Sequence, residues 1–212
     1  MKKVYVYKGF ERFWHWTQAS LIIFLALTGF EVHGTFDILG FEHAARFHRI
    51  ASWMLMGLIV FAIFWHFVTG EWRQYIPTTT KLVEQIRFYS IGMFKGEKNP
   101  MNKTEVRKLN PLQRLVYLGF KLVLIPITVV SGIFYMFHKT IDKNKVVVIS
   151  EIPLESLAFW HTLGAILLMV FLVIHVYMTT TGHTPTSNIA AMITGYEELE
   201  EAEDMDASDK HI

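Results

Sequence analysis

Two histidines in the most apolar stretch of the chain have the spacing and chemistry of metal ligands. His161 and His175 lie in a run of apolar residues that, with its flanks, is long enough to cross a bilayer as a helix. Fourteen helical residues make about four turns and rise about 21 Å, so both imidazoles leave nearly the same face, one near each edge of the hydrocarbon layer. Because a histidine inside a membrane span is costly, it usually has a partner or a function. Two on one face indicate two cofactors stacked across the membrane.

Two further histidines open other apolar stretches at matching depths. His15 begins the first stretch and His48 begins the second. If successive spans alternate in direction, His15 lies on the same side of the membrane as His175, and His48 on the same side as His161. Two neutral imidazoles on opposite faces of a planar macrocycle give six-coordinate haem iron, which transfers electrons and has no open site for a substrate. The sequence therefore predicts haem iron held by an inner pair, His15 with His175, and by an outer pair, His48 with His161.

His66 is the alternative inner ligand. It follows His48 by eighteen residues, which is about five whole turns, so it shares that helix face at the inner end. We prefer His15, because the sequence Phe-Trp-His-Phe around His66 is typical of a histidine that hydrogen-bonds at the lipid headgroups. The remaining histidines lie in loops or tails and are expected at the surface: His33, His43, His138, His183 and His211.

Other residues near the four histidines have types that suit a haem. Arg12 lies close to His15, and Arg46 and Arg49 flank His48, so these guanidinium groups are expected to pair with haem propionates at the two membrane surfaces. Small residues follow both outer ligands by one turn. These residues, Ala51 and Gly164, are expected to let a flat ring lie close to the helix backbone.

The composition is that of an integral membrane protein. The 212 residues are 52% hydrophobic, and a soluble domain of this size rarely carries several uninterrupted apolar runs. The chain has no cysteine, which excludes disulfides, iron–sulfur ligation, thiolate zinc sites and covalent haem attachment. Imidazole is therefore the expected metal ligand. The net charge of +1 gives no reason to expect a nucleic-acid partner, and no cleavable signal peptide is expected.

Four apolar runs predict an all-α fold: an integral membrane four-helix bundle. The runs are separated by polar stretches and cover about residues 13–30, 47–68, 112–137 and 157–180. They are expected to form a single membrane domain, residues 1–195, which includes a short cytoplasmic linker helix between the second and third spans. Residues 196–212 are acidic and are expected to form a disordered cytoplasmic tail. Lysine and arginine gather before the first span and between the second and third, so the positive-inside rule places both termini in the cytoplasm.

These motifs resemble the prokaryotic di-haem cytochrome b561 family, which includes the cytochrome b (gamma) subunits of formate dehydrogenases, nickel–iron hydrogenases and thiosulfate reductases. The resemblance covers about residues 8–185. It rests on the His15-Trp16 pair, on His161 and His175, and on Asn110-Pro111-Leu112-Gln113 before the third span. It implies two b-type haems held by the four histidines, electron exchange with membrane quinone (menaquinone or ubiquinone), and catalytic and electron-transfer subunits as partners. The implied location is the bacterial inner membrane.

The same resemblance implies a quinone pocket near the inner haem. Asn110 and Gln113 are one turn apart at the entry to the third span, and their amides could hydrogen-bond a quinone carbonyl. A structural role is compatible with this one, because Asn110 precedes Pro111 and suits a helix N-cap. Deeper in the span, Lys121 could reach towards the surface, pair with a propionate or supply protons. Pro126 is expected to kink the helix.

Two other functions compete with the role of a quinone-reactive subunit. One is a stand-alone cytochrome b561 enzyme, such as a superoxide:quinone oxidoreductase, and the other is a membrane anchor without haem. The long basic linker and the acidic tail give the chain more surface than a minimal four-helix cytochrome needs. That extra surface favours an electron-transfer subunit of a larger oxidoreductase.

Overall fold

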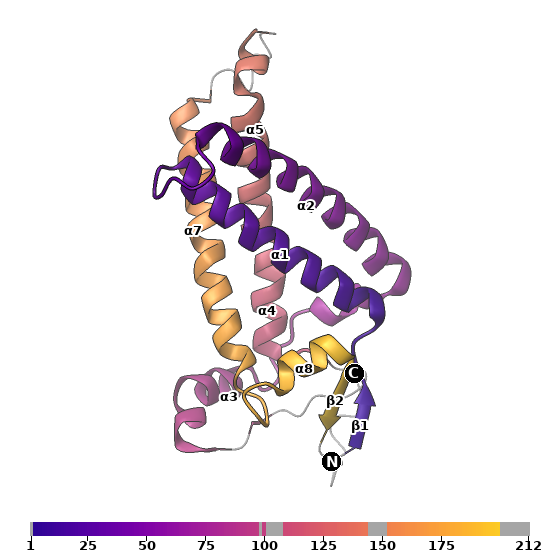
Figure 1. The fold of residues 1–212 in the computed structure, drawn as a ribbon. Coiled ribbons are helices and arrows are strands. Elements are labelled where there is room, and N and C mark those ends of the chain that lie inside the picture. The colour runs from indigo at the N-terminus through magenta and orange to yellow at the C-terminus, as the bar shows by residue number, and fades with distance from the viewer. Residues whose placement is uncertain (1, 98, 101–107, 144–151, 200–212) are drawn as a thin grey trace.

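The structure is a computed structural model that describes residues 2–97, 99–100, 108–143 and 152–199. Its long helices form two hairpins (Figure 1). In the first hairpin, α1 (Gly9–Val32) packs antiparallel along α2 (Phe41–Thr69). In the second, a continuous helix built from α4 (Pro111–Gly119), η4 (Phe120–Leu124) and α5 (Ile125–Lys143) packs along α7 (Leu154–Thr179). The predicted all-α membrane bundle is confirmed.

Three helices of the described chain are long and apolar enough to cross a membrane: Phe41–Thr69, Pro111–His138 and Leu154–Thr179. The first helix, α1, has 24 residues and is therefore about 36 Å long, but His15, Gln18 and Glu31 make it more polar than the others. Its crossing of the membrane stays a prediction. The observed helices also begin three to six residues before the expected second and fourth spans, because their first turns are polar.

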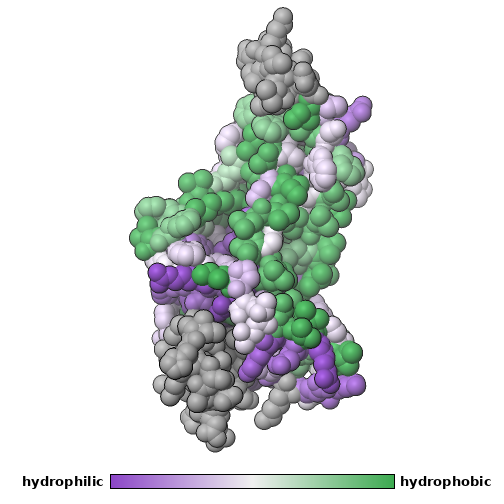
Figure 2. Space-filling model, turned by 180° about the vertical axis from the view of Figure 1, so that it is seen from behind, coloured by the Kyte–Doolittle hydropathy of each residue, from purple (hydrophilic) through white to green (hydrophobic). Residues whose placement is uncertain are grey.

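The outward faces of the long helices are apolar. Figure 2 shows hydrophobic residues over most of their length and hydrophilic residues gathered towards one end. Among the exposed side chains of α2 and α7 are Val60, Phe64, Phe67 and Val173. An exposed apolar surface of this extent is unfavourable in water and favourable in lipid, so these faces are lipid contacts.

The helix of the third span departs from α-helical geometry just before Pro126, and the kink expected there stays a prediction. Proline has no N–H to donate to the carbonyl of Leu122, and its ring crowds that carbonyl. The helix widens into the π-helical turn η4 immediately before it, where the Ile125 N–H bonds back to the Phe120 oxygen, five residues earlier. π-Turns of this kind often mark functional positions. Here the widened turn carries Lys121.

The short elements gather at the end of the molecule where the two described chain ends lie, which we call the inner end (Figure 1). The linker contains the 3₁₀ turn η1 (Glu71–Tyr75), the expected short helix α3 (Leu82–Arg87), the π-turn η2 (Phe88–Gly92) and the 3₁₀ turn η3 (Met93–Lys95). After α7, the helix α8 (Ser187–Thr194) folds back beneath the bundle.

A two-stranded antiparallel ribbon joins the two ends of the described chain. The strand β1 (Lys2–Tyr5) pairs with β2 (Tyr196–Leu199), with Tyr5 opposite Tyr196. Gly195 has a φ of 88°, which favours glycine and lets the chain reverse between α8 and β2. The tail was expected to begin at residue 196, so its first four residues depart from that expectation. They are ordered because β1, remote in sequence, supplies their hydrogen bonds; residues 200–212 lie outside the described part of the chain.

Candidate functional site

Four histidine rings face one another in two pairs between the hairpins. At the inner end, His15 on α1 faces His175 on α7, with ring centroids 6.1 Å apart. At the outer end, His48 on α2 faces His161 on α7, also with centroids 6.1 Å apart. The structure thus brings together the two pairs that the sequence predicts. One helix, α7, contributes a ring to each pair, and the first hairpin contributes the opposing rings.

The separation within each pair suits a metal ion between the rings. An imidazole nitrogen lies about 2 Å from a bound transition metal, so two nitrogens on opposite sides of one ion are about 4 Å apart. Adding the distance from each nitrogen to its ring centre places the two centroids about 6 Å apart. The observed 6.1 Å in both pairs therefore fits bis-imidazole coordination of haem iron.

The outer rings are oriented by hydrogen bonds at Nδ1. His161 Nδ1 lies 2.9 Å from the carbonyl oxygen of Thr128. His48 Nδ1 lies 3.0 Å from the hydroxyl of Thr28, which itself bonds to the carbonyl of Phe24 at 2.9 Å. A carbonyl, and a hydroxyl whose proton is already donated, can only accept, so each Nδ1 carries the ring proton. Each Nε2 then has a free lone pair, as a metal-ligating histidine requires.

Two glycines of the second hairpin allow close packing around the outer histidine pair. A Cβ atom on Gly132 of α5 would lie 2.8 Å from Cε1 of His161, so only glycine leaves room for the ring. Gly164 has a role in helix packing, and its expected role beside a flat ring stays a prediction. A Cβ there would collide with the side chain and Cα of Thr128, so Gly164 allows α5 and α7 to pack closely. Ala51, its predicted counterpart on α2, is buried.

The inner rings line a cavity of about 1060 Å³ that extends from the histidine pair to the inner end of the molecule. His175 stacks on Phe171, with centroids 5.6 Å apart and planes 10° from parallel. Two buried polar atoms beside this cavity, His15 Nδ1 and Trp14 Nε1, have no hydrogen-bond partner within the described chain. Unsatisfied polar atoms at a cavity of this size fit a bound group with polar atoms of its own, as a haem has.

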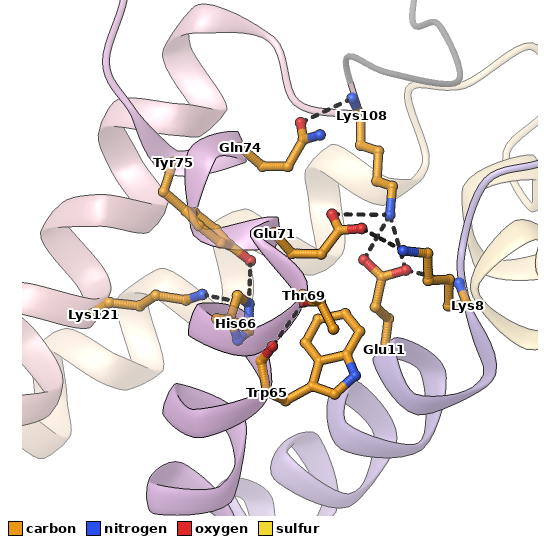
Figure 3. Close-up of polar contacts among 10 residues, drawn as sticks. All are labelled: Lys8, Glu11, Trp65, His66, Thr69, Glu71, Gln74, Tyr75, Lys108 and Lys121. Carbon is orange, nitrogen blue, oxygen red and sulfur yellow. Dashed lines mark hydrogen bonds and ion pairs between the residues drawn. The ribbon is translucent and has the colours of Figure 1, made fainter.

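His66, the alternative inner ligand, has protein partners at both ring nitrogens. Its Nδ1 lies 2.6 Å from the carbonyl oxygen of Ala62, and its Nε2 lies 3.3 Å from the Tyr75 hydroxyl and 3.4 Å from Lys121 Nζ (Figure 3). The ring that faces His175 is that of His15. The arrangement therefore favours His15 as the inner ligand, because the ring nitrogens of His66 already contact Ala62, Tyr75 and Lys121.

The three arginines proposed for propionates lie in different surroundings. Arg12 donates through Nη1 to the carbonyl of Ile193 at 2.6 Å, while its Nε is buried without a partner in the described chain. Arg46 and Arg49 are exposed on α2 on either side of His48. Arg12 thus retains a buried donor that a propionate could use, and its assignment, like that of Arg46 and Arg49, stays a prediction.

The two amides proposed for quinone form a capping box. Asn110 Oδ1 accepts from the Gln113 N–H at 2.8 Å, and Gln113 Oε1 accepts from the Asn110 N–H at 3.1 Å. Asn110 also donates to the Tyr89 hydroxyl at 3.0 Å. The amide of Asn110 is thus occupied by structural bonds. Gln113 lines the inner cavity, so it is the one of the pair with access to a ligand there.

A cluster of four charged residues, not anticipated from the sequence, lies beside the cavity. We call it the inner ion cluster: Lys108 Nζ is 2.8 Å from Glu11 and 3.4 Å from Glu71, and Lys8 Nζ is 2.8 Å from Glu71 (Figure 3). Burial opposes ionisation of Glu71, but the two lysines outweigh it and hold its pKa below the usual range. The cluster joins α1, η1 and the chain before α4. No local pattern could reveal it, because its members are up to 100 residues apart in sequence.

An apolar helical bundle with facing histidine rings, one pair of which lines a cavity of about 1060 Å³, is the arrangement expected of a membrane cytochrome b. The chain belongs to the prokaryotic cytochrome b561 family, whose sequence model matches residues 6–195. The predicted family is confirmed, and with it the function of a haem-binding membrane cytochrome b that transfers electrons.

Curated relatives match most of the chain. A putative cytochrome YdhU of Escherichia coli is 25% identical over 92% of this chain and 75% of its own length. A probable Ni/Fe-hydrogenase B-type cytochrome subunit of Rhizobium leguminosarum is 24% identical over 96% and 92%. A protein of the same description from Bradyrhizobium diazoefficiens is 28% identical over 91% and 85%. No solved structure matches the chain.

Proposed function

We propose that the chain is a di-haem cytochrome b that carries electrons between membrane quinone and a partner oxidoreductase. The observation that carries this proposal is the pair of facing histidine sets, each with ring centroids 6.1 Å apart and each using one ring from α7. The inner haem would be held by His15 and His175, and the outer haem by His48 and His161. Bound haem would supply reversible one-electron chemistry at each position.

The chain positions the two sites for electron transfer across the membrane. Fourteen residues of α7 separate His161 from His175, which is a rise of about 21 Å. Hydrogen bonds to Thr128 and Thr28 hold the outer rings in one tautomer, so those rings need little rearrangement when the charge of the site changes. Apolar helices would keep the segment between the two histidine pairs within the lipid layer.

Quinone is proposed to react at the inner cavity, where Gln113 can donate a hydrogen bond. We infer from the distribution of lysine and arginine that this end faces the cytoplasm of a bacterial inner membrane, with both termini inside. A redox centre of the partner would then meet the outer site. An electron that moves between the sites crosses much of the membrane potential, which is worth about 2.3 kcal/mol per 100 mV for a full crossing.

Partnership with catalytic and electron-transfer subunits is supported by two relatives whose names describe them as Ni/Fe-hydrogenase cytochrome subunits. Mild-detergent purification of the chain from its native membrane tests this part of the proposal. Co-purification with an iron–sulfur or metal-containing oxidoreductase subunit is the expected result. A chain that purifies alone and reduces quinone with superoxide would instead establish the stand-alone enzyme.

A further inference from the structure

Three polar side chains from three elements meet on the wall of the inner cavity. His66 comes from the end of α2, Tyr75 from η1 and Lys121 from the π-turn η4. Lys121 Nζ lies 3.4 Å from His66 Nε2 and 3.4 Å from the centre of the Tyr75 ring, and the Tyr75 hydroxyl lies 3.3 Å from the same Nε2 (Figure 3). We call this group the His66 cluster.

The bonding of the His66 cluster leaves one nitrogen available for proton exchange. His66 Nδ1 donates its proton to the carbonyl of Ala62 at 2.6 Å, so the free lone pair of the ring is at Nε2. Burial raises the pKa of Tyr75, and its hydroxyl therefore stays protonated as a donor. Both Tyr75 and Lys121 can then donate to Nε2, and each can be re-protonated from the cavity.

Lys121 has surroundings unlike those of a structural lysine. No ion pair of Lys121 exists within the described residues, and its amine is held by the Tyr75 ring, by His66 and, at 5.0 Å, by the ring of Trp14. A lysine in an apolar span is costly, and its amine changes protonation state readily when it is withdrawn from water. A lysine that is held without a counterion at a ligand cavity is suited to exchange protons there.

The His66 cluster is adjacent to the inner ion cluster. Glu71 lies four residues before Tyr75 on η1, and Glu11 and Lys108 line the same cavity. From Glu71 the ion cluster reaches solvent through Lys8, whose side chain is 55% exposed. The titratable groups that face the His66 cluster from the elements around it are Tyr7, Glu11, Glu71, Lys108 and Tyr117, and Lys8 pairs with Glu71 behind them. Carboxylates and water in the cavity can therefore carry protons between the cluster and the inner surface.

Quinone chemistry requires such a route. Oxidation of one quinol releases two electrons and two protons, whereas six-coordinate haem iron would accept the electrons one at a time and has no position that binds a proton. We propose that Lys121, positioned by His66 and Tyr75, exchanges protons with the quinone in the inner cavity and passes them to Glu71 and Glu11. Each turnover in the direction of quinol oxidation moves two protons along this route from the cavity to the inner surface. Each quinone reduction moves two protons from the inner surface to the cavity. This inference rests on the proposed function, in which quinone uses this cavity.

Substitutions of Lys121 separate proton exchange from the other roles a lysine could have. Lys121→Arg keeps the positive charge and the contact with the Tyr75 ring, but an arginine does not lose its proton in proteins. It should therefore preserve packing or pairing with a propionate, and abolish proton exchange. Lys121→Met removes the charge and keeps the length, and Tyr75→Phe keeps the ring and removes the hydroxyl. Lys95→Met in η3 is the matched control, because Lys95 is exposed.

The experiment uses the full chain in its native complex. Short-chain menaquinol and ubiquinol analogues are mixed with the oxidised protein in a stopped-flow instrument, and haem absorbance and a pH-indicator dye are followed together. Lys121→Arg and Lys121→Met should slow quinol-driven haem reduction and proton release about 10²-fold or more, the usual contribution of a positioned acid–base group. Tyr75→Phe should slow both less, and Lys95→Met should match wild type.

A second measurement needs no quinone. The reduction potential of the haem held by His175 is titrated with redox mediators across a range of pH. In wild type it should fall as pH rises, because reduction draws a proton into the His66 cluster, and in Lys121→Arg this dependence should become shallower. Wild-type kinetics and wild-type pH dependence in Lys121→Arg would overturn the inference and leave the proposed function intact. A wild-type protein that neither quinol reduces would overturn the proposed function itself. If Lys121→Met loses haem, Lys121→Arg alone decides the outcome.

Discussion

Thr128 and His161 are linked across the second hairpin by a bond between the threonine carbonyl and the ring Nδ1, at 2.9 Å. This bond fixes the tautomer of the ring and leaves its lone pair at Nε2, in a ring whose centroid lies 6.1 Å from that of His48. It also ties the outer site to α5, although the opposing ligand belongs to the first hairpin. The haem proposed here would therefore join the two hairpins. Substitutions at the α5–α7 contact should weaken haem binding at the outer site before they affect the inner one.

Gly132→Ala should impair the outer haem and spare the inner one. The added methyl would lie 2.8 Å from the His161 ring, which is already held by Thr128, so the ring must move away from the iron position. The expected result is loss or weakening of one of two haems, measured by redox titration of the absorbance spectrum. Gly57→Ala is the control, since nothing lies within 4 Å of a Cβ there. Two unchanged haems in Gly132→Ala would contradict the packing argument.

Lys108→Met should destabilise the protein without removing a proposed ligand. The Lys108 side chain is 8% exposed and the Glu11 and Glu71 side chains 13%, so the substitution leaves Glu11 without its lysine and Glu71 with Lys8 alone. A loss on the order of 3 kcal/mol is expected for a broken buried pair. Thermal unfolding in one detergent, monitored by circular dichroism, measures it against Lys95→Met. An unchanged midpoint would show that water or lipid compensates the carboxylates.

The same cluster predicts how acid affects stability. In the folded protein the pKa of Glu71 is lower than the ordinary value of 4.5, against the effect of burial, because Lys8 and Lys108 favour its charged form. A lowered pKa contributes stability that is complete above 4.5 and is lost as pH falls through the folded value. Wild type should therefore lose more stability than Lys108→Met on acidification below that pH. Parallel acid profiles for the two proteins would refute the contribution of the cluster.

Gln113→Ala and Asn110→Ala should differ in effect. Gln113 lines the cavity, so its loss should slow quinol oxidation while both haems remain reducible by dithionite. Asn110 caps α4 and bonds Tyr89, so its loss should mainly cost stability, about 1 kcal/mol for a helix cap. Stopped-flow kinetics and thermal unfolding of both variants distinguish these outcomes. If both variants slow quinol oxidation equally and are equally stable, both amides belong to the quinone site.

The absence of cysteine allows the orientation to be tested directly. Ile38, between α1 and α2, is 80% exposed at the outer end, and Lys95 is exposed at the inner end. In intact spheroplasts, Ile38→Cys should react with a membrane-impermeant maleimide, whereas Lys95→Cys should react only after the membrane is permeabilised. The opposite pattern would reverse the proposed topology and place the inner cavity outside the cytoplasm.

The sequence predicted the parts of the site that follow from helical periodicity. The facing of His15 with His175, and of His48 with His161, follows from span order and from fourteen residues of regular helix. The distortion at Pro126 follows from the missing N–H. Such features depend on local geometry, and a helix repeats its geometry reliably over this distance.

The features that sequence reasoning missed depend on contacts between distant segments. The strand Tyr196–Leu199 looked like the start of an acidic tail, because nothing local shows that Lys2–Tyr5 will pair with it. The partners of Lys108 are 97 and 37 residues away. The approach of Gly132 to His161 is visible only once α5 and α7 are packed together.

The haem content of the purified chain tests the central claim most directly. Pyridine haemochrome analysis should give two non-covalent b-type haems per wild-type chain, one in His161→Ala, one in His175→Ala, and two in His66→Ala. Each ligand variant should lose a different component of the redox titration, because α7 contributes one ring to each site. A wild-type chain with one haem or none, or a haem lost with His66 and not with His15, would contradict the two facing pairs as the haem ligands.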